Sequence, residues 1–274
     1  FCNYYYNCLR DVDRHMMKLI HSLEDTGQID NTIIFMISDH GEMLGQQGAR
    51  GKIVSWEESI RVPTLVYHPD LKDKKLCNSV ISNIDIVPTL LEFTGLSKSE
   101  LRDKHPELKG NSYAELVENV NYDNVRDKEG HLIHGVQIIP TVFEVAEKFR
   151  HTALADGFLA KTKAFMSEGK FLPDFTPPLN YKGVVDKKHK FLRFFSPRQN
   201  NIPTNYDELT KYNAEYQLYD LENDPFEMND LAKDENNRDL LMSMNDKCNT
   251  LADKEIGLEN HVIHLPGPDW FWTA

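Results

Sequence analysis

The sequence lacks any long hydrophobic run. No apolar stretch approaches the roughly 18 residues that a bilayer-spanning helix needs, so no membrane-spanning segment is predicted. An excess of positive charge is also missing, since 43 Asp and Glu residues against 31 Lys and Arg residues give a formal net charge of -12. This charge disfavours nucleic acid or an anionic membrane surface as the main partner, whereas a local basic site for a small anion is compatible with it.

Cysteine is scarce as well. The four cysteines show neither the spacing of metal ligands nor the density of a disulfide scaffold, and they are Cys2, Cys8, Cys77 and Cys248. Internal repeats and low-complexity segments are absent from the sequence. With 274 residues, of which 40% are hydrophobic, the chain can form a globular core as one large or two smaller domains.

The order of the predicted elements indicates an α/β fold. Apolar residues recur at helical spacing from Leu9 to Leu23. The segments Asn31–Ile37 and Val62–Tyr67 are typical of central parallel strands that helices cover on both faces. A helix is predicted from Asp85, as its N-cap, to a stop at Gly95. Because the sequence begins inside the first helical pattern, we expect it to be the C-terminal portion of a longer protein.

The pattern changes in the second half of the chain. From Lys98 to Asn180 it is loose, and one or two helices are expected within residues 131–165. Residues 181–197 and 215–232 are typical of short antiparallel strands, with a hairpin around Lys187 and Lys188. A last helix is predicted over Glu235–Asp253.

The chemistry of the sequence concentrates in residues 32–52, TIIFMISDHGEMLGQQGARGK. Ligands of open α/β sheets gather at the carboxyl ends of strands, where Asp39 and His40 are expected. A carboxylate oxygen and an imidazole nitrogen can hold a divalent cation together with further ligands. The glycines that follow allow a tight loop, from which Lys52 could return to neutralise an oxyanion. The plainer interpretation, in which Asp39 caps a turn and His40 is simply exposed, stays open on these residues alone.

Four segments resemble successive blocks of the sulfatase family, within the alkaline phosphatase superfamily. They are TIIFMISDHGEMLGQQGARGK, WEESIRVPTLVYHP, ISNIDIVPTLLEFTG and YQLYDLENDPFEMNDLA, in the family's order. The resemblance implies an alkaline-phosphatase-like, parallel-rich sheet flanked by helices, with a smaller C-terminal antiparallel sheet and helix. Residues 1–180 would then be the C-terminal part of the catalytic domain, with 98–180 a poorly matched, insertion-like segment, and residues 181–274 would form the small subdomain.

The resemblance also implies roles for residues of the first block. Asp39 and His40 match the second pair of the family's metal ligands, and Lys52 matches the lysine that contacts the sulfate oxygens. Arg50 is a weaker candidate for contact with substrate. Calcium is the cation expected first, and the imidazole makes manganese a plausible alternative beside magnesium.

One part of the family's active site has no match in this sequence. The family's nucleophile is a formylglycine made from the cysteine, or less often the serine, of a Cys-x-Pro-x-Arg motif. None of the four cysteines stands in that context, so we expect the nucleophile upstream. The predicted function is metal-dependent hydrolysis of sulfate esters, with the chain alone incomplete and inactive. The alternatives are a phosphonate or phosphodiester hydrolase, or a non-catalytic remnant that binds an anion or a partner protein. The location is left open between periplasmic or secreted, as the resemblance suggests, and cytoplasmic.

Overall fold

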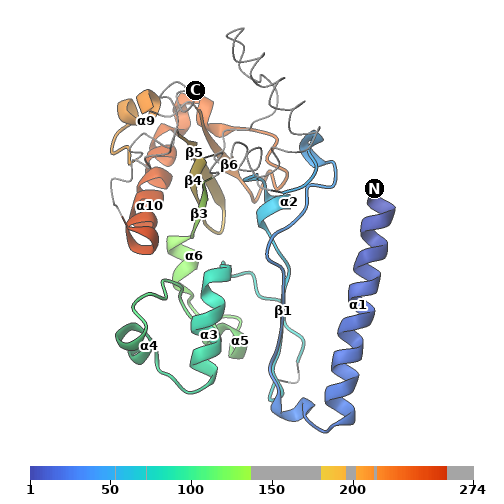
Figure 1. The fold of residues 1–274 in the computed structure, drawn as a ribbon. Coiled ribbons are helices and arrows are strands. Elements are labelled where there is room, and N and C mark those ends of the chain that lie inside the picture. The colour runs from blue at the N-terminus through green and yellow to red at the C-terminus, as the bar shows by residue number, and fades with distance from the viewer. Residues whose placement is uncertain (53, 72, 137–179, 196–201, 213–214, 258–274) are drawn as a thin grey trace, which may run out of the picture. The chain divides into compact units, whose positions relative to one another are not determined.

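The structure is a computed structural model that describes residues 1–52, 54–71, 73–136, 180–195, 202–212 and 215–257. The chain divides into two compact units, Phe1–Lys128 and Glu129–Ala274, and each is described by itself. Figure 1 shows their helices and strands. The sequence places its domain boundary later, between residues 180 and 181, and its assignment of family roles to the two regions stays a prediction.

The first unit combines helices with a two-stranded sheet. Its elements are α1 (Cys2–Asp25), η1 (Ile29–Asn31), β1 (Ile34–Ile37), η2 (Gln46–Gly48), α2 (Glu57–Ile60), β2 (Thr64–Tyr67), η3 (Asn83–Asp85), α3 (Ile86–Phe93), α4 (Lys98–Lys104), α5 (Ala114–Glu118) and α6 (Val125–Glu129). The helices predicted before Gly27 and after Asp85 are thus confirmed, as are both strands. The ring of Phe35 in β1 lies 6.2 Å from that of Phe93 in α3, so this helix covers one side of the strand.

The predicted direction of the two strands is wrong. β1 and β2 pair antiparallel, in a register that runs from Ile34 opposite Tyr67 to Ile37 opposite Thr64. Neither strand is fully buried, and Ile37 at the end of β1 is exposed. A continuous apolar run indicates a strand that is covered on both faces, which is common in parallel sheets but does not exclude antiparallel pairing. The antiparallel pairing of β1 with β2 is selected by tertiary contacts, which the apolar pattern does not contain.

The second unit is built on an antiparallel sheet. Its elements are β3 (His131–Val136), β4 (Asn180–Val185), β5 (His189–Phe194), α9 (Tyr206–Tyr212), β6 (Glu215–Asp220), η4 (Leu231–Lys233), η5 (Glu235–Asn237) and α10 (Arg238–Ile256). The strand order is β3-β4-β5-β6, and every neighbouring pair is antiparallel. The predicted hairpin at Lys187 and Lys188 and the predicted last helix are confirmed.

The core of this unit lies between the sheet and α10. Period-two alternation places Val184, Phe191 and Leu218 on one face of the sheet, where Leu241 and Met244 of the helix pack against them. All five side chains are almost fully buried. Burial of this kind contributes about 1.5–3 kcal/mol for each large apolar side chain, which makes α10 the main support of the sheet.

The strand β3 was not predicted, because His131 to Val136 was assigned to a region of one or two helices. The structure pairs it with β4, His131 opposite Val185 and Val136 opposite Asn180. Gly135 favours this outcome locally, since a Cβ atom there would lie 2.3 Å from the Tyr181 ring. A strand at the edge of a sheet is selected by such tertiary contacts more than by its own propensity. The rest of the predicted helical region lies outside the described residues.

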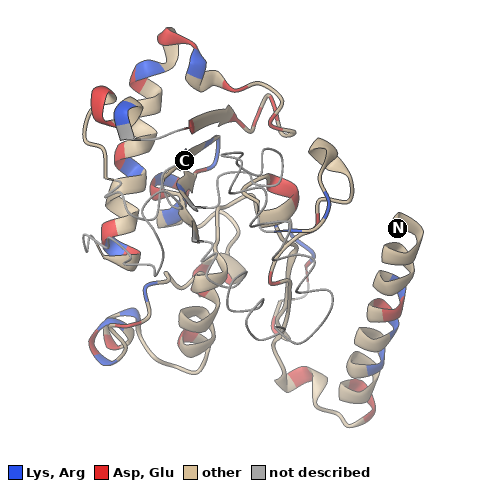
Figure 2. Cartoon of the chain, turned by 45° about the horizontal axis from the view of Figure 1, so that its top comes forward, with Lys and Arg blue, Asp and Glu red and all other residues tan. Residues whose placement is uncertain are grey.

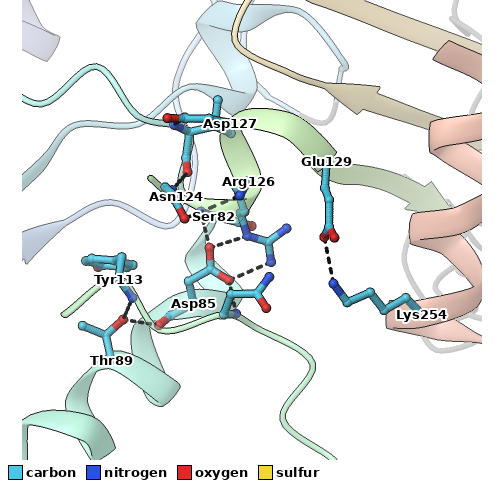
Figure 3. A network of polar contacts seen from close by, with 11 residues as sticks. Ser82, Asp85, Thr89, Tyr113, Asn124, Arg126, Asp127, Glu129 and Lys254 are labelled. Carbon is cyan, nitrogen blue, oxygen red and sulfur yellow. Dashed lines mark hydrogen bonds and ion pairs between the residues drawn. The ribbon is translucent and has the colours of Figure 1, made fainter. Parts of the chain in front are cut away.

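A buried ion pair ties the first unit together. The Arg126 guanidinium donates to both carboxylate oxygens of Asp85, at 2.5 and 2.7 Å, and both side chains are 1% exposed. The same carboxylate accepts the backbone N–H groups of Ser82 at 2.9 Å and of Asn111 at 2.7 Å. Figure 3 shows this network around the start of α3. Asp85 therefore stands at the helix start, as predicted, but also anchors a segment 41 residues away.

Charge is distributed without a single dominant patch along the first helix. Figure 2 shows acidic and basic residues interspersed along α1. In the described part of the chain, no helix combines the length and the apolarity needed to cross a bilayer.

Candidate active site

β1 ends at Ile37, and Ser38 separates it from Asp39 and His40. The hydroxyl of Ser38 donates to the His40 carbonyl at 2.8 Å, which closes a tight turn at this point. Asp39 projects outward with 84% of its side chain exposed, whereas that of His40 is 38% exposed. The Asp39 Oδ2 and His40 Nε2 atoms are 3.4 Å apart, so the two candidate ligands lie side by side.

The Asp39 carboxylate is held in its charged form. Its Oδ1 atom accepts the backbone N–H of His40 at 2.9 Å. This hydrogen bond lowers the pKa of Asp39 below its ordinary value, and the nearby His40 and Lys52 side chains act in the same direction. A carboxylate that stays ionised is the form that binds a cation.

The hydrogen bonds of His40 define its tautomer. Its Nδ1 atom lies 2.8 Å from the carbonyl oxygen of Gly41, which can only accept, so Nδ1 carries the proton. The Nε2 atom lies 2.6 Å from Lys52 Nζ, and the ammonium donates to it. The lone pair of Nε2 therefore points away from the backbone, which is the arrangement that a metal-binding histidine uses.

Gly41 is required by close packing against α2. Its N–H donates to the Ser59 carbonyl at 2.7 Å. A Cβ atom at this position would lie 2.0 Å from the backbone oxygen of Glu58, so no other residue fits without moving the loop. This contact fixes the direction in which the chain leaves His40.

The following loop returns Lys52 to His40, as the sequence predicts. The backbone N–H of Met43 donates to the Gly51 carbonyl at 2.9 Å, and the Met43 side chain is buried beneath the loop. Lys52 thus comes from 12 residues further along the chain to contact the imidazole. The structure brings Asp39, His40 and Lys52 into one place.

Arg50 is not part of this cluster in the described structure. Its guanidinium lies 5.7 Å from the centre of the Phe1 ring. Its proposed contact with substrate stays a prediction.

Two residues of the site were not found from the sequence. Asn83 Nδ2 donates to the Ser38 carbonyl at 3.1 Å, with the Asp39 carbonyl 3.5 Å away, and so supports the turn that carries the candidate ligands. Glu42 accepts the backbone N–H of Gly51 at 2.6 Å. Both act on backbone atoms of residues distant in sequence, for which a local pattern gives no signal.

The donor set suits part of a cation's coordination shell. Asp39 offers anionic oxygen, and His40 offers the Nε2 lone pair that now accepts a hydrogen bond from Lys52. Calcium, magnesium or manganese can bind these two donors to different degrees. Within the described ranges, no group of three or more His, Cys, Asp or Glu side chains is arranged to hold a metal ion. The two residues would thus need further donors to complete a site.

Comparison with known proteins finds similarity in this region. The model of the sulfatase family matches residues 1–96, a span that contains Asp39, His40 and Lys52. Among curated sulfatases, the arylsulfatase of Clostridium perfringens is 33% identical over 121 residues, which are 43% of this chain and 24% of that protein. The choline-sulfatase of Rhizobium meliloti is 36% identical over 98 residues, 36% of this chain and 19% of that protein. The chain thus spans less than a quarter of the length of these relatives.

Solved structures extend the likeness to both units. A protein solved with its substrate D-glucosamine-2-N,6-O-disulfate matches 92% of this chain and 40% of its own, with a TM-score of 0.60 and 20% identity. The phosphonate monoester hydrolase of Agrobacterium radiobacter matches 90% of this chain and 40% of its own, with a TM-score of 0.58 and 21% identity. At this identity the likeness concerns the fold, and it confirms the predicted alkaline-phosphatase-like α/β class.

Proposed function

We propose that the chain contributes part of the active site of a metal-dependent sulfuric ester hydrolase. The observation that carries the proposal is the meeting of three side chains: His40 Nε2 lies 3.4 Å from Asp39 Oδ2 and 2.6 Å from Lys52 Nζ. All three lie in the span that the model of the sulfatase family matches. The proposed substrate is a sulfate ester, a class supported by the sulfated substrate bound in one structural neighbour.

In this proposal each residue has a distinct task. Asp39 and His40 would hold the divalent cation, with calcium as the first candidate and magnesium or manganese as alternatives. A bound cation would orient the nucleophile and stabilise charge on the sulfate oxygens. The ammonium of Lys52 binds a sulfate oxygen and neutralises the charge that develops during ester cleavage. The Gly41 carbonyl keeps the proton of His40 on Nδ1, so that Nε2 stays a ligand.

The nucleophile is proposed to come from outside these 274 residues, as a formylglycine, because no cysteine of the chain stands in a Cys-x-Pro-x-Arg context. The remaining metal ligands are proposed to come from outside as well. On its own the chain is then expected to bind cations weakly and to turn over no ester.

The first test is calorimetric titration of the chain with calcium, magnesium and manganese. Asp39→Ala and His40→Ala should each abolish the binding that the unaltered chain shows. Matched controls are Asp70→Ala and His105→Ala, whose side chains are 89% and 39% exposed, close to the values of the two candidate ligands. Loss of binding in the controls, or none in the site variants, would remove Asp39 and His40 from the metal site.

The second test is turnover by an enzyme that contains this chain together with the nucleophile. Lys52→Ala should lower the hydrolysis of an aryl sulfate by about 10²-fold, the effect of losing one group that stabilises an oxyanion. Lys104→Ala, which removes an exposed lysine paired with Glu100, should leave the rate unchanged. The main alternative is a phosphonate hydrolase, because two phosphonate monoester hydrolases share the fold. An aryl phosphonate assayed in parallel distinguishes this alternative from a sulfatase. Faster turnover of the phosphonate would favour that function, and no turnover of either ester would favour a non-catalytic protein.

A further inference from the structure

Glu42 lies between the candidate ligands and the loop, and its carboxylate serves the backbone. The half-buried side chain turns along the loop, and Oε1 accepts the N–H of Gly51 at 2.6 Å. Gly51 is the residue immediately before Lys52. Glu42 therefore acts on the chain at the point where Lys52 departs from it.

A second hydrogen bond holds Gly51 in place. The Gly51 carbonyl accepts the N–H of Met43 at 2.9 Å. Two consecutive residues, Glu42 and Met43, thus bind both backbone polar groups of Gly51. The Met43 side chain is buried, which fixes the position of these two hydrogen bonds in the unit. Gly51 has a φ angle of +84°, in the left-handed region that favours glycine, so the chain turns sharply there.

The two hydrogen bonds to Gly51 determine the direction in which the Lys52 side chain leaves the loop. The turn at Gly51 sends the lysine back over the loop, where Nζ reaches His40 Nε2 at 2.6 Å. Lysine has a long and flexible side chain with three rotatable donors, so its ammonium keeps one place only if its backbone is fixed. Fixing that backbone is what the Glu42 carboxylate does.

We propose that Glu42 is a positioning residue for Lys52. The proposal rests on the proposed function for the task of Lys52, and on the contacts above for the task of Glu42. Glu42 acts as a hydrogen-bond acceptor, not through its charge and not as a metal ligand. The described residues agree with this, because Asp39, His40 and Glu42 do not form a group able to hold a metal ion.

The experiment compares Glu42→Ala with Glu42→Gln in the full chain. Glutamine keeps an oxygen that can accept the Gly51 N–H but removes the charge. The readout is the ¹⁵N resonance of His40 Nε2, which reports whether this atom accepts a hydrogen bond, at a pH where the imidazole is neutral. Lys52→Ala supplies the resonance position for the broken contact. Glu42→Ala should move the resonance most of the way to that position, and Glu42→Gln should leave it near the original one.

A binding measurement tests the functional side. Affinity for inorganic sulfate in the presence of calcium should fall about tenfold in Glu42→Ala, the size of one hydrogen bond to a charged group. It should fall no further when Glu42→Ala is added to Lys52→Ala, because the carboxylate acts only through the lysine. Glu107→Ala, which removes an exposed carboxylate paired with His105, is the control and should change nothing.

The two proposals fail in different ways. If Glu42→Ala leaves the His40 resonance in place, or if glutamine behaves like alanine, the positioning role is refuted whatever the chain binds. If the resonance moves as expected but an enzyme that contains this chain together with the nucleophile hydrolyses no sulfate ester, the positioning role stands and the proposed function is refuted.

Discussion

Substitution of Gly41 by alanine tests the packing on which the candidate site depends. The added methyl carbon would lie 2.0 Å from the Glu58 backbone oxygen and 3.0 Å from the Glu58 carbonyl carbon. Backbone atoms cannot rotate away as a side chain can, so the loop must lift from α2. Overpacking of this kind costs about 1–3 kcal/mol. The hydrogen bond from Gly41 N to Ser59 O, 2.7 Å in length, would be lost for about 1 kcal/mol more.

The expected destabilisation of Gly41→Ala is therefore about 2–4 kcal/mol, measured by urea denaturation. Gly48→Ala in the same loop is the matched control. Gly48 has a φ angle of +71° and open space around it, so alanine there should cost only about 1 kcal/mol of backbone strain. Cation binding should fall in Gly41→Ala and persist in Gly48→Ala. Equal stability of the two variants, or normal cation binding by Gly41→Ala, would show that contact with α2 does not hold Asp39 and His40 in place.

Two further predictions concern the second unit. Lys190 Nζ and Glu227 Oε1 form a fully buried ion pair at 2.6 Å. Lys190→Met should destabilise the chain by about 3–5 kcal/mol, because the Glu227 charge is left buried. The double change Lys190→Met, Glu227→Gln should recover much of this loss in denaturation experiments. Burial alone would raise the pKa of Asp186, but hydrogen bonds from Lys247 and from the N–H groups of His189 and Lys188 outweigh it and lower that pKa. The ionised Asp186 carboxylate therefore stabilises the fold above its unfolded-state pKa of about 3.9. This stabilisation is lost as the pH falls through the lower pKa of Asp186 in the folded state. Asp186→Asn should cost about 1–2 kcal/mol at pH 7 and less towards pH 3, and a cost independent of pH would contradict this assignment.

The sequence predicts those features of the site that depend on short segments. The apolar strand before Asp39 and His40 and the glycine-rich return to Lys52 are local patterns, and the structure brings these three side chains together. The roles of Glu42 and Asn83 depend on backbone groups of distant residues, which a local pattern does not contain. The direction of β2 relative to β1 and the pairing of β3 with β4 are choices of tertiary structure for the same reason.

A final prediction follows from the single lone pair of His40 Nε2. In the structure this lone pair accepts from Lys52 Nζ at 2.6 Å, so a cation bound to Nε2 must displace the ammonium. Two positive charges would then stand close together beside one exposed carboxylate, and an anion between them would relieve the repulsion. Sulfate should therefore strengthen calcium binding, and calcium should strengthen sulfate binding by the same factor, because coupling between two sites is reciprocal. Calorimetric titrations of calcium with and without sulfate measure this coupling, and Lys52→Ala should reduce it while strengthening calcium binding on its own. Calcium binding that Lys52→Ala leaves unchanged would mean that the cation does not use Nε2 of His40.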